Sequence, residues 1–388
     1  MTAQPAVDLS PLWQVMLVGS LLAAAALGWM WLRQRDKKRS GWLRPLTLLT
    51  LFLTFDLVLF GAFTRLTDSG LGCPDWPGCY GNASPVGASA SISEAQSALP
   101  SGPVTHGKAW IEMVHRYLAT GVGVLILVLA VASWRTRFGH GDKAPGAGRW
   151  WPIATLVWVC IQGAFGALTV TMKLFPAIVT LHLLGGLMLL ALLGMQAERL
   201  GRRQSGRPQA MVNPATRALM LTAFALLGLQ VALGGWVSTN YAVLACTDFP
   251  MCQNSWWPEM HFDKGFQIWR ELGLTRSGEH LTFAALTAIH FVHRWMAAVV
   301  LVALGLLAWR LANIPGLRIQ SRCIAWLAAM QLATGVANVV LGWPLAAALA
   351  HTAGAAALVL VLTWTVAASR SNTRVASMSR LTAMDLSA

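Results

Sequence analysis

Four of the nine histidines in the chain occupy matched places and could bind a metal. Two of them stand in the related segments EMVHRYLATGVG and HFVHRWMAAVVL. The other two each follow a glutamine at the same spacing, in IQGAFGALTV…LH and MQLATGVANV…AH. The four residues form two matched pairs: His115 with His182, and His293 with His351.

Paired histidines inside apolar segments point to haem. An ionisable side chain in such a segment is costly and is a functional candidate. Two imidazoles on facing helices of a bundle suit the two axial positions of a haem iron. Zinc would need further ligands, and copper is less suited because His115, His182 and His351 have no Met or Cys one turn away. A hydrogen bond between helices would explain one isolated histidine, but two matched pairs favour haem.

Residues beside the histidines could complete haem sites. Arg116 and Arg294 each follow a histidine and could pair with haem carboxylates, although interfacial arginines also extend toward water without such a role. A flat ring also needs small neighbours, and the glycines that follow the histidines are Gly121, Gly123, Gly185, Gly186 and Gly354.

The two pairs differ at one position. Glu112 lies three residues before His115, whereas His290 takes that place in the second half. Residues three apart share a helical face, so Glu112 should point toward the same site as His115. A carboxylate there can act as acid, base or nucleophile. We expect one site with a reactive acid and one without; His290 is expected to be a hydrogen-bonding neighbour, and the role of Asp56 is left open.

Two C-x5-C segments occur, GLGCPDWPGCYG in the first half of the chain and VLACTDFPMCQN in the second. A six-residue separation can close if the proline-containing loop bends, and disulfides persist outside the cytoplasm. The sequence therefore predicts the disulfides Cys73–Cys79 and Cys246–Cys252. A redox-active thiol pair, or a transient site for handing over metal or haem, is the alternative.

The composition indicates that membrane helices position these residues. Hydrophobic residues make up 56% of the chain, charged residues 11%, and the mean hydropathy is +0.56. Soluble proteins carry about 25% charged residues. We predict an all-α integral membrane protein whose nine apolar spans are 11–32, 45–64, 110–134, 150–172, 176–196, 217–239, 283–309, 323–343 and 345–369.

The net charge of +14 predicts an orientation. Most basic residues fall in alternate loops and in the C-terminal tail, so the positive-inside rule makes these segments cytoplasmic. The N-terminus then lies outside and the C-terminus inside, and the histidine sites lie toward the outer leaflet. The excess charge is therefore explained by topology, and no nucleic-acid partner is expected.

The recurring motifs keep the same order, which predicts two parallel four-helix repeats after one extra helix. Within them, residues 84–104 should form a surface loop. The predicted units are an extra helix and basic loop (1–44), a first bundle (45–200), a cytoplasmic linker (201–216), a second bundle (217–369) and a disordered tail (370–388).

Several of these motifs together resemble the haem A synthase family, membrane enzymes of cytochrome oxidase assembly. The similar segments are GAFTRLTDSGLGCPDWPGCYG, EMVHR, TLHLLGG, FVHR and ALAHTAGA, and the resemblance covers about residues 45–369. The helix at 11–32 departs from the usual eight-helix pattern of that family.

The resemblance implies an oxidoreductase that converts a methyl group of haem O to the formyl group of haem A by successive hydroxylations with water as the oxygen source. It also implies a bacterial-type plasma (inner) membrane, and haem O synthase and an electron acceptor as partners. The implied roles are Glu112 as the catalytic carboxylate, His115, His182 and Arg116 at haem O, and His293, His351 and Arg294 at a haem b cofactor.

Two other functions fit parts of the sequence. A transmembrane electron-transfer cytochrome with two b-type haems would have the histidine pairs but no substrate to modify. A transporter or haem-delivery protein would have the repeats, although matched histidines near the outer leaflet do not suggest alternating access. The acid present in only one half favours the enzyme, because a symmetric electron relay does not need it.

Overall fold

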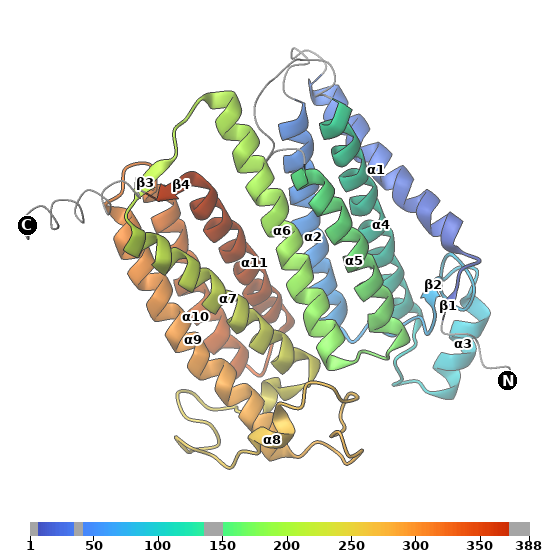
Figure 1. Cartoon of the computed structure of the whole chain (residues 1–388). Helices are drawn as coiled ribbons and strands as arrows, with labels where there is room; N and C mark the ends of the chain where they lie inside the picture. The colour runs from blue at the N-terminus through green and yellow to red at the C-terminus, as the bar shows by residue number, and fades with distance from the viewer. Residues whose placement is uncertain (1–6, 35–41, 136–149, 372–388) are drawn as a thin grey trace, which may run out of the picture.

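The computed structural model describes residues 7–34, 42–135 and 150–371. Nine helices in these ranges are long and apolar enough to cross a membrane, and they lie close to the nine predicted spans (Figure 1). The all-helical membrane class is therefore confirmed. The nine helices are α1 (Leu12–Gln34), α2 (Leu43–Leu66), α4 (His106–Arg135), α5 (Trp150–Thr171), α6 (Pro176–Ser205), α7 (Pro214–Thr239), α9 (Phe283–Ala312), α10 (Arg318–Val340) and α11 (Leu345–Ala368).

The helices satisfy their own backbone groups, as apolar surroundings require, and local signals set several of their ends. Pro214 opens α7, and the Asn213 side chain accepts the N–H of Thr216 at 2.7 Å. Proline suits a first turn because its missing N–H is not needed there. Gly206, with φ +64°, follows the last residue of α6 in the left-handed conformation that glycine adopts without strain.

The helix contacts define two rings of four helices each, which lie side by side in Figure 1. In the first ring α2 and α5 each contact both α4 and α6, and in the second α7 and α10 each contact both α9 and α11. Helix α1 packs against α4 from outside the first ring. This arrangement confirms two four-helix bundles with one additional N-terminal helix.

Helices α6 and α11 meet between the rings, where α6 also contacts α7 and α11 contacts α2. A polar cluster joins the same rings near the cysteine segments. Nη2 of Arg65 donates to the carbonyl of Ser238 at 2.5 Å, and the Tyr241 hydroxyl donates to Asp68 at 2.7 Å. Both contacts join residues at the same separation along the chain, so equivalent segments of the two repeats meet there.

Short helices and strands lie at both ends of the rings. The prediction of a loop over 84–104 is wrong in part, because α3 (Ser89–Ala98) forms a helix that buries Ile92 completely and packs on α4. Ile92 is the one buried residue of α3, so the sequence of this segment has no repeated apolar spacing from which a helix could have been predicted. The remaining short elements are α8 (Phe262–Gly265), η1 (Ala242–Leu244) and the parallel pairs β1 (Val7–Asp8) with β2 (Trp76–Pro77) and β3 (Ala210–Val212) with β4 (Ser369–Ser371).

The predicted domain boundaries stay predictions. Helix α6 continues to Ser205 and β3 lies within the predicted linker, where β3 pairs with the residues that follow α11. Most of the predicted tail, 372–388, and the predicted basic segments 35–41 and 136–149 lie outside the described residues.

Candidate functional site

The structure places the members of each histidine pair at opposite corners of a ring. His115 lies on α4 and His182 on α6, and these helices are bridged on both sides by α2 and α5. His293 on α9 and His351 on α11 repeat the arrangement. The two histidines of each predicted pair therefore lie on opposite helices of one ring, and their pairing as haem ligands stays a prediction.

A glycine on a neighbouring helix lies against each imidazole. A Cβ atom at Gly61 would lie 3.0 Å from Nε2 of His115, and one at Gly234 would lie 3.0 Å from Cε1 of His293. Both distances are shorter than ordinary contacts of a side chain, so glycine makes room for these rings. Gly61 and Gly234 take equivalent places in the two repeats, because each stands at the same spacing before its cysteine loop.

The other two histidines have glycines of their own. A Cβ atom at Gly166 would lie 3.4 Å from His182, and one at Gly335 would lie 3.4 Å from His351. Several glycines named from the sequence instead meet other groups, because they face neighbouring helices. Gly121 faces Gly19, Gly185 faces Gln162, and Gly354 faces Gln331.

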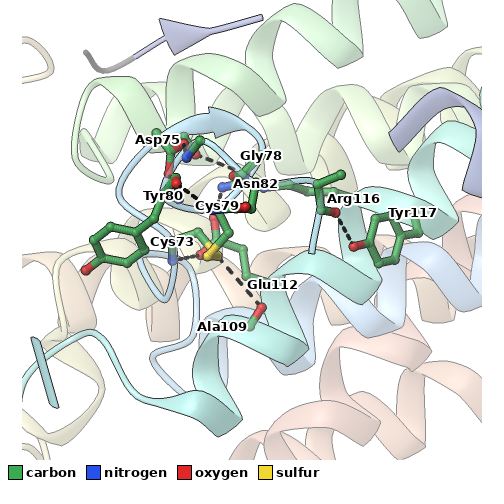
Figure 2. The surroundings of a disulfide bond; sticks show 12 residues. Cys73, Asp75, Gly78, Cys79, Tyr80, Asn82, Ala109, Glu112, Arg116 and Tyr117 are labelled. Carbon is green, nitrogen blue, oxygen red and sulfur yellow. Dashed lines mark hydrogen bonds and ion pairs between the residues drawn. A yellow bond between two sulfur atoms is a disulfide. The ribbon is translucent and has the colours of Figure 1, made fainter. Parts of the chain in front are cut away.

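Glu112 is buried beneath the first cysteine loop (Figure 2). Its Oε2 accepts the backbone N–H of Cys73 at 2.8 Å, and its Oε1 accepts from the guanidinium of Arg116. The predicted disulfide between Cys73 and Cys79 is present and is itself buried. The carboxylate is therefore held between the disulfide loop and the arginine one turn later.

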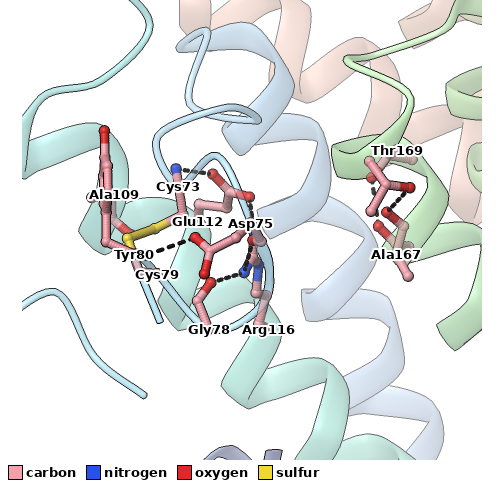
Figure 3. A network of polar contacts seen from close by, with 12 residues as sticks. Cys73, Asp75, Gly78, Cys79, Tyr80, Ala109, Glu112, Arg116, Ala167 and Thr169 are labelled. Carbon is pink, nitrogen blue, oxygen red and sulfur yellow. Dashed lines mark hydrogen bonds and ion pairs between the residues drawn. A yellow bond between two sulfur atoms is a disulfide. The ribbon is translucent and has the colours of Figure 1, made fainter. Parts of the chain in front are cut away.

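Arg116 also shapes the loop above it (Figure 3). Its guanidinium donates to the carbonyls of Asp75, at 3.0 Å, and Gly78. The Asp75 carboxylate in turn accepts the N–H groups of Tyr80 at 2.6 Å and Gly81 at 2.8 Å. Burial, followed by the charge of Asp75, raises the pKa of the Tyr80 phenol above its usual value, so this side chain stays neutral under physiological conditions.

The second cysteine loop repeats this construction with one replacement. Cys246 and Cys252 form the second predicted disulfide. The N–H of Cys246 donates to Nδ1 of His290 at 3.3 Å, and Arg294 donates to the loop carbonyls of Pro250 at 2.9 Å and Met251 at 3.1 Å. His290 is thus a hydrogen-bonding neighbour of the loop and takes the place of the carboxylate in the first repeat.

The two arginines differ in whether their guanidinium groups have an unpartnered hydrogen-bond donor. The guanidinium of Arg116 contacts both loop carbonyls and Glu112. Nη1 of Arg294 is buried and has no hydrogen-bond partner among the described residues. A buried donor without a partner is costly, so a haem carboxylate would be well matched at Arg294. The pairing of either arginine with haem stays a prediction.

Four residues that support the cysteine loops or the imidazoles were not predicted from the sequence. Asp75 and Asp248 brace their loops in the same way, since Asp248 accepts the N–H of Asn254 at 2.7 Å. Gln230 and Thr334 reach the imidazoles of the second pair. Aligning the repeats at the spacing of the cysteines pairs the two aspartates and would have found them. Gln230 and Thr334 have no counterpart of the same type in the first repeat.

The fold and site define a class: multi-pass, all-helical membrane proteins built from two related four-helix bundles, each with a facing pair of histidines. Within that class, the chain belongs to the family described as "Cytochrome oxidase assembly protein", whose model matches residues 44–363. The additional helix α1 lies before the matched region.

Individual relatives are similar in sequence to most of this chain. A protein of Shewanella oneidensis named "Heme A synthase" is 38% identical over 81% of this chain and 92% of its own length. Proteins with the same name from Sphingopyxis alaskensis, 30% identical over 82% of this chain and 88% of theirs, and Rhizorhabdus wittichii, 27% identical over 85% and 93%, are also similar.

Proposed function

We propose that this protein is a haem A synthase, an oxidoreductase that converts a methyl group of haem O to the formyl group of haem A. The observation that carries the proposal is the difference between two otherwise equivalent sites. Each has a facing histidine pair and a disulfide loop, but only the first has a carboxylate, Glu112, where the second has His290. Membership of the cytochrome oxidase assembly family and the names of the relatives support it.

The proposed substrate site lies in the first bundle. His115 and His182 would hold haem O between them, and the glycines beside their rings leave space for the imidazoles. Each hydroxylation of the methyl carbon takes its oxygen from water and removes two electrons and two protons, and loss of water from the second product leaves the formyl group. We assign Glu112 the role of the catalytic carboxylate toward this methyl group.

The proposed cofactor site lies in the second bundle. His293 and His351, on opposite helices of the second ring, and the unpartnered Nη1 of Arg294 fit a haem b and one of its carboxylates. A haem b bound there would supply a one-electron relay inside the protein. The residues of this bundle orient that group; they lack the carboxylate assigned to chemistry in the first.

The proposed orientation follows the charge pattern of the sequence. With the positive-inside rule, both disulfide loops and both histidine pairs lie toward the outer face of a bacterial-type plasma (inner) membrane. The N-terminus is outside and the C-terminus in the cytoplasm. Haem O synthase as supplier of substrate and a separate electron acceptor are the partners that the reaction requires.

Extraction of haems from purified protein tests the proposal. The wild-type protein, produced together with haem O synthase, should contain haem b and form haem A. Glu112→Ala should retain haem b and accumulate haem O, with conversion reduced about 100- to 10,000-fold, the usual contribution of a positioned acid or base. Undiminished haem A in this variant would refute the role of Glu112. Haem b alone in wild-type protein supplied with haem O would favour the electron-transfer cytochrome.

A further inference from the structure

The two histidine pairs differ in what holds their imidazoles. Nδ1 of His351 lies 2.9 Å from Oγ1 of Thr334 on α10, and Nδ1 of His293 lies 3.1 Å from the side-chain amide of Gln230 on α7. In the first pair, Nδ1 of His182 is buried without a partner among the described residues. The ring of His115 is stacked on Phe60.

The contact at Thr334 defines which ring nitrogen of His351 is free. The Thr334 hydroxyl donates its proton to the carbonyl of Met330 at 2.8 Å. Its oxygen can then only accept from the imidazole, so Nδ1 of His351 carries the hydrogen. The lone pair of Nε2 is left for a metal, which is the arrangement found in metal-binding histidines. The side-chain amide nitrogen of Gln230 lies 3.1 Å from Nδ1 of His293 and donates to the His293 backbone carbonyl at 3.2 Å, so Gln230 holds this residue from the neighbouring helix without defining which ring nitrogen is free.

The first repeat has apolar side chains at both equivalent positions. Thr334 corresponds to Phe165, since each stands directly before the glycine that lies against the second histidine of its pair. Gln230 corresponds to Leu57, since each stands one helical turn before the glycine that lies against the first histidine of its pair. The helices and glycines are shared, so the difference between the pairs lies in these two side chains.

We infer that Gln230 and Thr334 are positioning residues that retain a permanent haem in the second bundle, whereas Leu57 and Phe165 leave the first pair loosely held so that its haem can exchange. The inference rests on the proposed function. A hydrogen bond to Nδ1 fixes ring orientation and makes the other nitrogen a better ligand. An enzyme that modifies one haem with the help of another must release the first and keep the second.

Haem transfer to excess apomyoglobin from the purified full-length protein tests the inference, with chromatography identifying the haems that leave. Thr334→Val preserves the shape of the side chain and removes the hydroxyl. We expect haem b to leave about 10- to 100-fold faster, the usual cost of losing such a partner, and its midpoint potential to rise because the ligand becomes less basic. Thr334→Ser should restore both values.

A matched control is available one residue from the ligand. The Thr352 hydroxyl donates to the carbonyl of Ala348, so Thr352→Val should leave the release rate and the potential unchanged. In the opposite direction, Phe165→Thr would supply a partner to Nδ1 of His182 and should slow release of haem O and haem A about tenfold or more.

The outcomes distinguish failure of this inference from failure of the proposed function. Release and potential of haem b that are unchanged in Thr334→Val and Gln230→Leu would overturn this inference and leave the proposed function intact. Unchanged release in Phe165→Thr would likewise overturn the explanation for the exchangeable site. Wild-type protein without haem would overturn the proposed function, and this inference with it.

Discussion

Oε2 of Glu112 accepts the backbone N–H of Cys73 at 2.8 Å, which ties the buried carboxylate to a disulfide loop. The equivalent N–H of Cys246 donates to His290. Each loop therefore rests on the residue that lies three positions before a paired histidine. The loops are therefore structural parts of the two sites.

Opening the first disulfide should disturb the chemistry more than the cofactor. In Cys73→Ser/Cys79→Ser the loop can move, and the carboxylate that it holds moves with it. A displacement of about 1 Å can cost about 100-fold in rate, so haem A formation should fall by that order while haem b content is preserved. Haem A measured against haem b by chromatography checks this. The matched Cys246→Ser/Cys252→Ser variant should instead lower haem b content, and equal effects of both pairs on one haem would contradict the assignment.

The unpartnered Nη1 of Arg294 predicts a contact with a haem carboxylate. Apoprotein should bind haem b about tenfold or more tightly than haem b dimethyl ester, because a charge-assisted hydrogen bond is lost with the esterified carboxylate. Arg294→Gln should bind both forms with similar affinity. Absorbance titration gives the two dissociation constants, and a preference that survives in Arg294→Gln would exclude this residue as the partner.

The glycines beside the imidazoles should be intolerant of even one methyl group. Gly234→Ala places a Cβ atom 3.0 Å from Cε1 of His293. Overpacking of this kind costs about 1–3 kcal/mol, so haem b affinity should fall about 10- to 100-fold and the haem absorption bands should shift. Gly228→Ala on the same helix has open space at its Cβ and should behave as wild type. Equal affinity in the two variants would argue against close packing at Gly234.

The packing of α1 on α4 predicts a variant that affects stability without affecting haem. A Cβ atom at Gly19 would lie 2.5 Å from the Thr120 side chain, so Gly19→Val should weaken this contact by about 1–3 kcal/mol. The thermal midpoint of the detergent-solubilised protein should fall, with haem b content unchanged because α1 lies outside the first ring. Gly28→Ala, where a side chain meets open space, is the control. Loss of haem b in Gly19→Val would mean that α1 also supports the second bundle.

Much of this architecture could be predicted because its signals are local. Spans such as Leu345–Ala368 follow from a continuous run of apolar residues, and both disulfides follow from the short, repeated cysteine spacing. The repeat was visible because its motifs keep their order. The same comparison exposed Glu112 as the position where the repeats differ.

Other features required the assembled helices. The three-residue spacing predicts that Glu112 shares a helical face with His115, but it does not reveal that the carboxylate oxygens meet Cys73 and Arg116. The glycines beside the imidazoles belong to other helices than the histidines.

By itself, the sequence determined the membrane class, the two repeats, the four histidines and the acid that distinguishes one half, because hydropathy and the recurrence of motifs depend only on the order of residues along the chain. Only the tertiary structure decided which groups hold each imidazole and each loop. Thr334 and His351 are 17 residues apart and Gln230 and His293 are 63 apart; whether such residues meet depends on how the helices rotate and pack against one another.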